Sequence, residues 1–370
     1  MIRAVAFVGP LPPPVHGFSI VCAHVRERLG ELSNVETFDR APRGNSDLAK
    51  RVGQMVLPLR YLRWHLRSRR VSMYLALSGG YGQLYDWPFL LISKCFSSVI
   101  VVHHHSFAYL NSPSRLNRIV LRFLRKDTHI ALSGGMRTSL MKVFQLDPAH
   151  VKVVSNAAFL PAAEADPGVA TPDPAPICLG FLSNITFAKG FVDVFAVLSQ
   201  LRARGISYSA RIAGPIDAKA SATFSDLLAG SVGTTYLGPI FGQAKDDFYR
   251  GLDCFLFPTD YANEAEPLVV HEAMRAGVHV IACDRGAIAE MLTNGAGRVF
   301  SKASFVPGAV DCIEEFSRNR AHLRQARRLS LEQFNRIQRS AVSALESLLR
   351  DMTGCGSVEH PASLTMTRKP

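Results

Sequence analysis

Residues 253–277 read DCFLFPTDYANEAEPLVVHEAMRAG, and this segment decides the fold prediction. Its first six residues form an apolar run that is typical of a buried strand. A polar loop with Glu264 follows, and Pro267 suits the first position of a helix because its missing N–H is not needed there. Gly277 suits the far end, where a left-handed residue often ends a helix. A strand, an acidic loop and a helix start favour a site for a phosphorylated ligand, because free N–H groups at a helix start attract phosphate.

Apolar strands alternate with helical patterns along the rest of the chain. In the first half we predict strands at residues 5–9, 73–77, 99–103, 128–132 and 151–154, and helices at 20–32, 55–70, 114–125 and 135–143. In the second half we predict strands at 177–181, 207–213, 235–237, 254–258 and 279–282, and helices at 190–204, 217–228, 245–250, 268–276, 303–318 and 320–349. This alternation predicts an α/β protein whose parallel sheets are covered by helices on both faces.

A proline-rich stretch separates the two halves. We therefore expect a first Rossmann-like domain at residues 1–160, a linker at 161–176 and a second Rossmann-like domain at 177–345. We also expect the C-terminal helix to pack back on the first domain, and residues 353–370 to form a disordered tail.

The composition excludes several classes of protein. With 48% hydrophobic and 19% charged residues, the 370-residue chain is globular rather than disordered. No apolar run reaches the ~18 residues of a membrane-spanning helix. The first residues read as a strand and not as a signal peptide. The seven cysteines form no CxxC pair, so we expect a reducing cytoplasm and neither a disulfide frame nor a zinc knuckle.

The charge is concentrated in the first half. Residues 1–158 carry 21 Lys and Arg against 8 Asp and Glu, which is +13, whereas residues 159–370 carry 21 against 22. Two segments each carry four arginines at helical spacing. The first set is Arg60, Arg63, Arg67 and Arg70, beside an apolar stripe of Met55, Leu59, Leu62 and Leu66. The second set is Arg115, Arg118, Arg122 and Arg125. One such helix is usually a core helix with a solvated face.

Two such helices in a strongly basic half favour an anionic membrane surface as partner. We do not expect nucleic acid, because no basic motif is interleaved with aromatic residues.

In order and spacing, residues 180–290 resemble the donor domain of retaining glycosyltransferases with the GT-B fold, glycosyltransferase family 4. The resemblance rests on Gly180, the pair Lys189-Gly190, the segments 210–214, 237–239 and 255–258, the pair Glu264 and Glu272, and residues 286–290. The first half resembles this family through the loop from Gly9 to Gly17 and the histidines after Val102. The resemblance implies two domains that face each other across a cleft, with the acceptor on the first and a nucleotide-sugar donor on the second.

The resemblance also implies roles for individual residues. Lys189 would meet the diphosphate as a point charge, and Glu272 would accept hydrogen bonds from the ribose hydroxyls. Glu264 would hold hydroxyls of the transferred sugar and shape charge near its anomeric carbon. The backbone amides of Leu268 and Val269 would cap the phosphate. Backbone near Ile240 would contact the base.

The first domain would add a glycine and a histidine to the site. Gly17 lets backbone approach a phosphate closely, although an ordinary turn explains it equally well. His103, His104 and His105 cannot all face one way on a strand. We rank His105 before His104 as the histidine near the donor sugar. A zinc site is the rival interpretation, but no matching ligand spacing supports it.

The sequence departs from the family pattern in three places. Ser183 and Asn184 stand where a basic residue is common, so one of them would replace its hydrogen bonds. Glu266 and Pro267 replace the usual Phe-Gly, which would put an extra acid beside the sugar. His16 precedes Gly17 where Gly-Gly is usual. These departures blur the identity of the donor.

We expect neither a metal nor another cofactor, because the chain contains no Asp-x-Asp motif to hold a divalent ion against the diphosphate. Lys189 and the helix amides would take the role of the metal. The resemblance implies retention of the anomeric configuration, and no carboxylate is assigned as a nucleophile.

We therefore predict a cytoplasmic glycosyltransferase, peripheral on the inner face of the cell membrane, that moves a sugar from a GDP- or UDP-sugar to a lipid-linked or glycan acceptor in surface polysaccharide assembly. The alternatives are a sugar-nucleotide epimerase of the same fold and a non-catalytic membrane-associated protein that binds nucleotide sugars. A nicotinamide-dependent oxidoreductase is disfavoured, because the GxGxxG fingerprint is absent.

Overall fold

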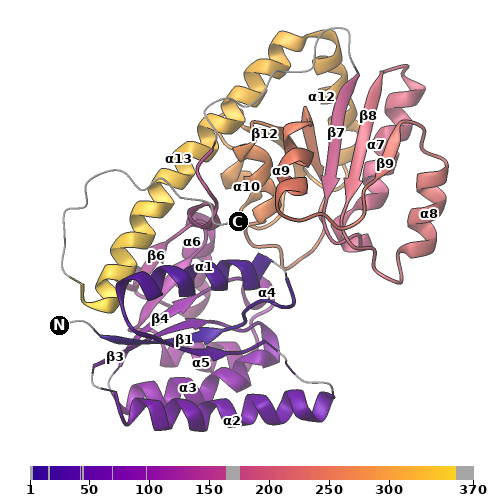
Figure 1. The fold of residues 1–370 in the computed structure, drawn as a ribbon. Coiled ribbons are helices and arrows are strands. Elements are labelled where there is room, and N and C mark those ends of the chain that lie inside the picture. Colours follow the sequence, from indigo (N-terminus) through magenta and orange to yellow (C-terminus); the bar gives the residue numbers. More distant parts are fainter. Residues whose placement is uncertain are drawn as a thin grey trace.

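A computed structural model describes residues 3–15, 17–41, 43, 46–68, 70–96, 98–163 and 176–355. The chain forms two α/β domains, one above the other in Figure 1. Each contains a six-stranded parallel sheet, so the predicted fold class is confirmed. His16, residues 164–175 of the predicted linker and residues 356–370 of the predicted tail lie outside the described residues.

The first domain is built on a sheet with the strand order β2-β1-β3-β4-β5-β6. Its strands are β1 (Ala4–Gly9), β2 (Val35–Asp39), β3 (Val71–Ala76), β4 (Val99–His103), β5 (Thr128–Ala131) and β6 (Val151–Val153). Its helices are α1 (Gly17–Leu32), α2 (Asp47–His65), α3 (Gln83–Cys95), α4 (Ala108–Asn111), α5 (Arg115–Phe123) and α6 (Gly134–Phe144), with the 3-10 turns η1 (Gly80–Gly82), η2 (Pro148–His150) and η3 (Asn156–Phe159).

The central strands of this sheet are buried on both faces. In β1, Val5 and Phe7 pack with residues of α1 and of the C-terminal helix. The alternate residues Ala6 and Val8 pack with residues of α2, α3, α5 and α6 on the other face. This is why the strands read as continuous apolar runs and not as an alternation.

The second domain is built on a sheet with the strand order β12-β11-β10-β7-β8-β9. Its strands are β7 (Ile177–Leu182), β8 (Tyr208–Ala213), β9 (Thr234–Tyr236), β10 (Cys254–Phe257), β11 (His279–Cys283) and β12 (Gly297–Phe300). Its helices are the 3-10 turn η4 (Phe187–Lys189), α7 (Phe191–Ala203), α8 (Ser221–Ala229), α9 (Gln243–Arg250), α10 (Leu268–Arg275), α11 (Ile288–Met291), α12 (Phe305–Arg318) and α13 (Arg320–Thr353).

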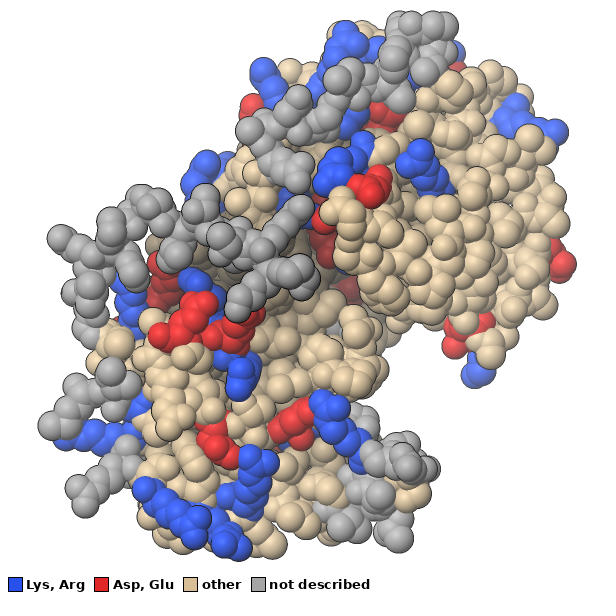
Figure 2. Space-filling view, in the orientation of Figure 1, with Lys and Arg blue, Asp and Glu red and all other residues tan. Residues whose placement is uncertain are grey.

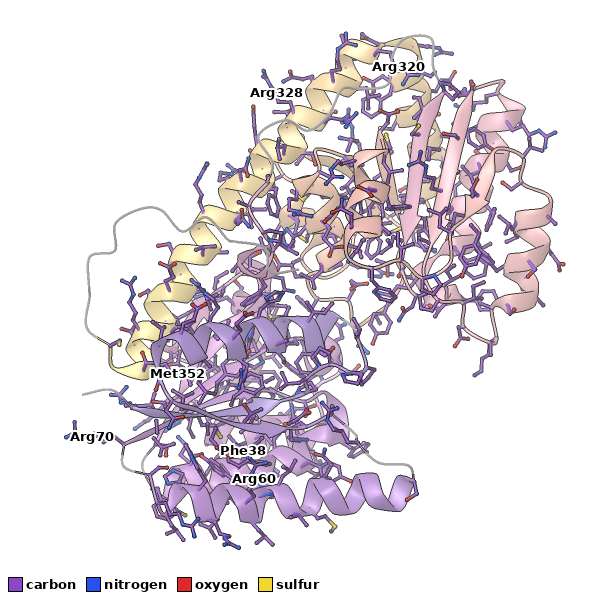
Figure 3. All side chains as sticks on the ribbon, in the orientation of Figure 1. Phe38, Arg60, Arg70, Arg320, Arg328 and Met352 are labelled. Carbon is purple, nitrogen blue, oxygen red and sulfur yellow. The ribbon has the colours of Figure 1, made fainter. Side chains whose placement is uncertain are left out.

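The 34-residue helix α13 joins the two domains and runs from the second down to the first (Figure 1). In its first half, Arg327 Nε donates to the carbonyl of Gly277 at 2.9 Å. In its last turns, Leu345, Leu348, Leu349 and Met352 pack into the first domain's core. Figure 3 labels Arg320 and Met352, which lie near the two ends of this helix. The first domain therefore contains residues from the end of the chain.

Two local predictions need correction. Pro267 is the N-cap of α10 and not its first helical residue, which is Leu268. The apolar stripe does not face the core: Met55 and Leu59 on α2, and Leu66 just after its end, are 70%, 62% and 65% exposed. Tyr61 is fully buried against Phe38 and Phe89, and Leu57 and Trp64 of the same helix pack against this core while partly exposed.

The seven cysteines are free. Among the described residues, no helix combines the length and the apolarity needed to cross a bilayer.

Candidate active site

The N-terminus of α10 is the structural centre of the site. This helix begins where the loop after β10 ends, and no side chain caps its first turn. The N–H groups of Leu268 and Val269, at the first two positions of the helix, therefore have no intrahelical partner, an arrangement that favours a bound anion. Gly277 has a φ of 65° just after the helix, as predicted. The local chain thus presents a short, rigid helix whose positive end faces the carboxyl edge of the second sheet.

The loop that carries Glu264 is held in place by a glycine of the neighbouring segment. Gly286 has a φ of 56°, and a Cβ at this position would lie 2.4 Å from the carbonyl oxygen of Glu264 and 2.3 Å from that of Ala265. Ala287 N also donates to the carbonyl of Ala265 at 2.7 Å. A side chain at residue 286 would therefore push the Glu264 loop away.

Lys189 and Glu264 are brought together, although 75 residues separate them. Lys189 Nζ lies 2.5 Å from Glu264 Oε2, and Thr259 Oγ1 donates to the same oxygen at 3.2 Å. The ammonium also lies 4.9 Å from the centre of the Tyr261 ring. Gly190, with a φ of 78°, allows the turn to pass close to Pro258, whose carbonyl oxygen would lie 2.2 Å from an added Cβ. The two residues that the sequence assigned to the diphosphate and the sugar thus share one location.

Glu272 is buried in a second cluster on α9 and α10. Lys245 Nζ donates to Glu272 Oε1 at 2.6 Å, and the Tyr249 hydroxyl donates to Oε2 at 3.1 Å. Burial, and then the Glu272 carboxylate, raise the pKa of Tyr249 well above its usual range, so this hydroxyl keeps its proton. Sequence reasoning missed Lys245, because nothing in a lone helical lysine signals a partner 27 residues away.

Gly17 from the first domain lies close to the first residue of α10. A Cβ added to Gly17 would lie 3.7 Å from Leu268 Cδ1. The ring of the next residue, Phe18, contacts that of His105 in a tilted arrangement, with ring centres 4.4 Å apart. The structure therefore brings Gly17 and His105 to the same side as the start of α10.

The three consecutive histidines have different surroundings. Burial, with a smaller effect of His104, lowers the pKa of His105 to about 3, so its ring is neutral at pH 7. His103 Nδ1 contacts the Tyr74 hydroxyl at 2.5 Å inside the domain.

His104, ranked second to His105, is turned into the interior of the first domain. His104 is fully buried, and its two ring nitrogens contact the Tyr109 hydroxyl at 2.7 Å and His129 Nδ1 at 3.0 Å. Successive side chains of an extended segment point to opposite sides, which separates His104 from His105.

The expectation that Glu266 lies beside the sugar is wrong. Its carboxylate is buried at the junction of the domains, where Ser155 Oγ donates to Oε1 at 2.6 Å and Asn156 N donates to Oε2 at 2.6 Å. His271 Nε2 lies 2.9 Å from Oε1. The side chain is only 6% exposed. Glu266 therefore ties the loop before α10 to the segment that leaves the first domain.

The remaining predicted residues lie at the edge of the second sheet. Ser183 is half-buried after β7, and its N–H donates to the carbonyl of Ala213 at 3.2 Å. Asn184 is exposed beside it. Ile240 packs against the apolar cluster that contains Tyr249, Phe255 and Val270.

Hydrogen bonds at two further places link the first domain to loops near the site. Glu290 Oε1 accepts from Gly135 N at 2.9 Å and from Ser133 Oγ at 3.0 Å, so α11 reaches the first turn of α6. Asn111 Nδ2 donates to the carbonyl of Ala262 at 2.5 Å. Both contacts join the loops around the site to the first domain. No group of three or more His, Cys, Asp or Glu side chains suited to a metal ion occurs among the described residues.

Comparison with protein-family models gives one match, which covers most of the second domain. Residues 164–330 match the family model of Glycosyl transferases group 1, a match that covers less than half of the chain. A comparison with curated protein sequences gives no match.

Solved structures resemble the whole chain in fold. Sucrose-phosphate synthase from Thermosynechococcus elongatus superposes with a TM-score of 0.72 at 12% identity, over 96% of this chain and 100% of that one. HepE of Anabaena, in complex with UDP and glucose, gives a TM-score of 0.65 at 15% identity over 94% and 100%. WaaG, a glycosyltransferase involved in lipopolysaccharide biosynthesis, gives 0.63 at 12% over 95% and 99%. The two parallel sheets and these neighbours define the fold as GT-B.

Proposed function

We propose that this protein is a glycosyltransferase that uses a nucleotide-diphosphate sugar, retains the anomeric configuration and needs no metal. The observation that carries the proposal is the uncapped start of α10, flanked by the Lys189–Glu264 pair and by buried Glu272. The match of residues 164–330 to Glycosyl transferases group 1 supports it. So does the neighbour HepE, which was solved with UDP and glucose.

The charges of the site fit a departing diphosphate. The amides of Leu268 and Val269 and the ammonium of Lys189 would stabilise its negative charge, which is commonly the largest single contribution to catalysis. Lys189 would leave Glu264 to reach the phosphate. Glu264 would then be free to accept hydrogen bonds from the sugar hydroxyls.

The proposed reaction exchanges one bond at the anomeric carbon for another. The bond from this carbon to the diphosphate oxygen breaks, and a bond to the acceptor oxygen forms on the same face of the sugar. The acceptor proton passes to the leaving phosphate. His105, neutral at pH 7 and beside Gly17, would position the sugar as a hydrogen-bonding group and not as a charge.

The acceptor is proposed to be lipid-linked or a glycan, in the assembly of a surface polysaccharide at the cytoplasmic face of the membrane. The neighbour WaaG is described as taking part in lipopolysaccharide biosynthesis. On α5, Ile119 and Phe123 are exposed at 57% and 36% among the exposed arginines Arg115, Arg118, Arg122 and Arg125. Figure 2 shows Lys and Arg side chains gathered along the lower rim of the first domain, over α2. Exposed apolar and basic residues together suit an anionic bilayer.

A transfer assay with a panel of nucleotide sugars tests the proposal. We expect Glu272→Ala and Lys189→Ala to abolish transfer in folded protein, and Glu264→Gln to lower turnover more than nucleotide affinity. Glu332→Ala, on the exposed side of α13, is the matched control. Full activity of folded Lys189→Ala would contradict the site. Conversion of the donor without any acceptor would favour the epimerase, and binding without turnover would favour the non-catalytic alternative.

A further inference from the structure

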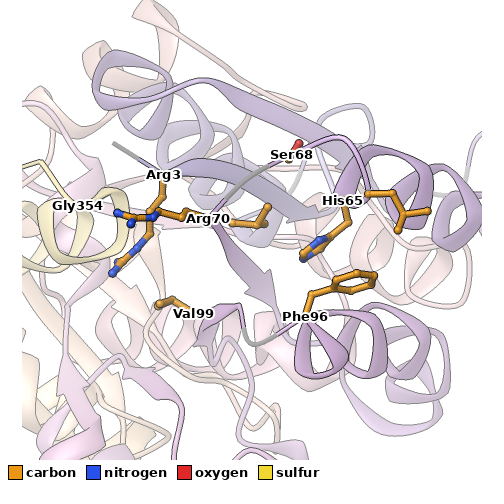
Figure 4. Close-up of a pocket in the computed structure, with 9 residues that line it drawn as sticks. Arg3, His65, Ser68, Arg70, Phe96, Val99 and Gly354 are labelled. Carbon is orange, nitrogen blue, oxygen red and sulfur yellow. The ribbon is translucent and has the colours of Figure 1, made fainter. Parts of the chain in front are cut away.

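A pocket of about 700 Å³ opens at the amino ends of the strands of the first domain (Figure 4). Its walls come from the segment before β1, the end of α2, the first residues of β3 and β4, and the end of α13. The candidate active site lies at the carboxyl ends of the strands. Because β3 is six residues long, roughly 20 Å of sheet separates the two rims. This volume is in the range of small-molecule sites, and the pocket is distinct from the cleft.

One end of the pocket is cationic. Arg3 and Arg70 lie side by side there (Figure 4). Arg3 Nη1 donates to the carbonyl of Asp351 at 2.9 Å, which fixes the direction of this side chain. Within the described part of the chain, no Asp or Glu lines the pocket, and none forms an ion pair with either arginine. Two adjacent guanidinium groups without a carboxylate form a site for an anion, and their planar forks suit the oxygens of a phosphate.

The backbone of Arg70 supports a ligand-binding role. Arg70 has a φ of 54°, a left-handed conformation that is uncommon for a long side chain. Backbone strain of this kind often occurs at sites that bind ligands. Here it places the guanidinium next to that of Arg3.

The other end of the pocket is aromatic and apolar. The His65 and Phe96 rings stack there with centres 4.6 Å apart. His65 Nε2 is held by Ser98 Oγ at 2.7 Å, and burial lowers the pKa of His65, so the ring is neutral at pH 7. Leu66 and Val99 add apolar walls that are 65% and 36% exposed. The pocket therefore offers a phosphate end and an apolar end.

We propose that this pocket binds the phosphate head group of an anionic lipid, with the phosphate between Arg3 and Arg70 and the apolar part of the lipid against Leu66 and Phe96. A membrane lipid fits better than a soluble phosphate compound, because the apolar wall continues outward along α2, where Leu59 is also exposed. The proposal deepens the membrane part of the proposed function and rests on it. It does not depend on sugar transfer.

Thermal unfolding of the full chain with soluble lipids tests the pocket. We expect dihexanoyl phosphatidate at about 100 times its Kd to raise the Tm of the wild type by about 2–4 °C. Dihexanoyl phosphatidylcholine should give a smaller shift, because its choline group repels the arginines. Arg70→Gly removes the charge and should abolish the phosphatidate shift while it relieves the strained φ. Gln145→Gly is the matched control, since Gln145 has a φ of 55° outside the pocket and the variant should keep the full shift.

The outcomes separate the lipid from other ligands and from the active site. An undiminished phosphatidate shift in Arg70→Gly would overturn the proposal. An equal shift from inorganic phosphate would overturn the lipid assignment and leave a free-phosphate site. A nucleotide-sugar shift should be unchanged in Arg70→Gly, so a failure of donor binding would show separately.

Vesicles test the same site in a bilayer. Arg70→Gly should reduce co-sedimentation with phosphatidate-containing vesicles by more than Arg122→Gln on α5 does. Equal losses in the two variants would contradict a specific pocket and leave only general surface charge.

Discussion

Lys245 Nζ lies 2.6 Å from Glu272 Oε1, and this contact joins α9 to the helix at the centre of the candidate active site. The carboxylate is 12% exposed, and its other oxygen accepts from Tyr249. A carboxylate has about four lone-pair positions, so two remain, and the proposed function assigns them to ribose hydroxyls. Glu272 is thus oriented before any nucleotide arrives.

Lys245→Met should destabilise the protein and weaken nucleotide binding. The variant leaves a largely buried carboxylate with one hydrogen bond fewer, which costs about 1–3 kcal/mol of unfolding free energy. Urea unfolding and calorimetric titration with UDP and GDP would measure the two effects. Lys219→Met, on an exposed lysine, is the control. If Lys245→Met and Glu272→Gln act additively in a double-mutant cycle, the two residues are not coupled.

Gly135→Ala should open the cleft. A Cβ at Gly135 would lie 2.4 Å from Glu290 Oε1, so the Glu290 carboxylate must shift and its hydrogen bond with Gly135 N is weakened. Hydrogen bonds at such an exposed position are worth about 0.5–1 kcal/mol, which is roughly a two- to fivefold change in the closed population. Small-angle X-ray scattering should report a larger radius of gyration. Gly79→Ala is the control, because nothing lies within 4 Å of the added atom. An unchanged radius in Gly135→Ala would contradict a role in closure.

His279→Leu should flatten the dependence of stability on pH. Burial lowers the pKa of His279 to about 4, below the 6.5 expected in the unfolded chain. The unfolded state therefore binds more protons between pH 4 and 6.5, and the free energy of unfolding rises with increasing pH by up to about 1.4 kcal/mol per unit in this window. Urea unfolding at pH 5 and pH 7 would measure the slope. His322→Asn, on the surface, should leave it unchanged, and a wild-type slope in His279→Leu would contradict the assignment.

Asp253→Ala should destabilise the second domain strongly. Asp253 is 1% exposed, and its carboxylate accepts from Cys178 N at 2.9 Å and from Arg327 Nη1 at 3.3 Å. Removing one partner of a buried ion pair leaves a buried charge and costs about 3–5 kcal/mol. Urea unfolding at pH 7 measures the change. Asp247→Ala, on an exposed helix face, should stay within about 0.5 kcal/mol, and a similar value for Asp253→Ala would contradict its role.

The sequence predicted the central strands of both sheets and one edge strand of each, β6 and β9. The strands it missed, β2 and β12, each form one edge of a sheet and are mostly half-buried, so they contain no continuous apolar run. It also missed α3, where Pro88 within the helix hid the helical pattern. A continuous apolar run indicates a strand that is buried on both faces, and β2 and β12 are less buried than that.

The sequence predicted Glu264, Glu272 and Lys189 because their spacing resembles that of a family. It could not place His104 or Glu266 correctly, because the direction of each side chain depends on partners in distant segments: His129 for one, Ser155 and Asn156 for the other. The sequence did not predict Lys245 as a site residue for the same reason. Local patterns place the backbone of a site, whereas long-range contacts decide which side chains face it.

The path of α13 has a consequence for biosynthesis. The first domain buries Leu345, Leu348 and Met352 beside residues of β1 and α1, yet the ribosome makes these leucines and this methionine more than 300 residues after β1. The surface of the first domain that α13 covers is therefore exposed to solvent while the second domain is translated. We expect chaperones that bind nascent chains to cover this face until the last helix emerges.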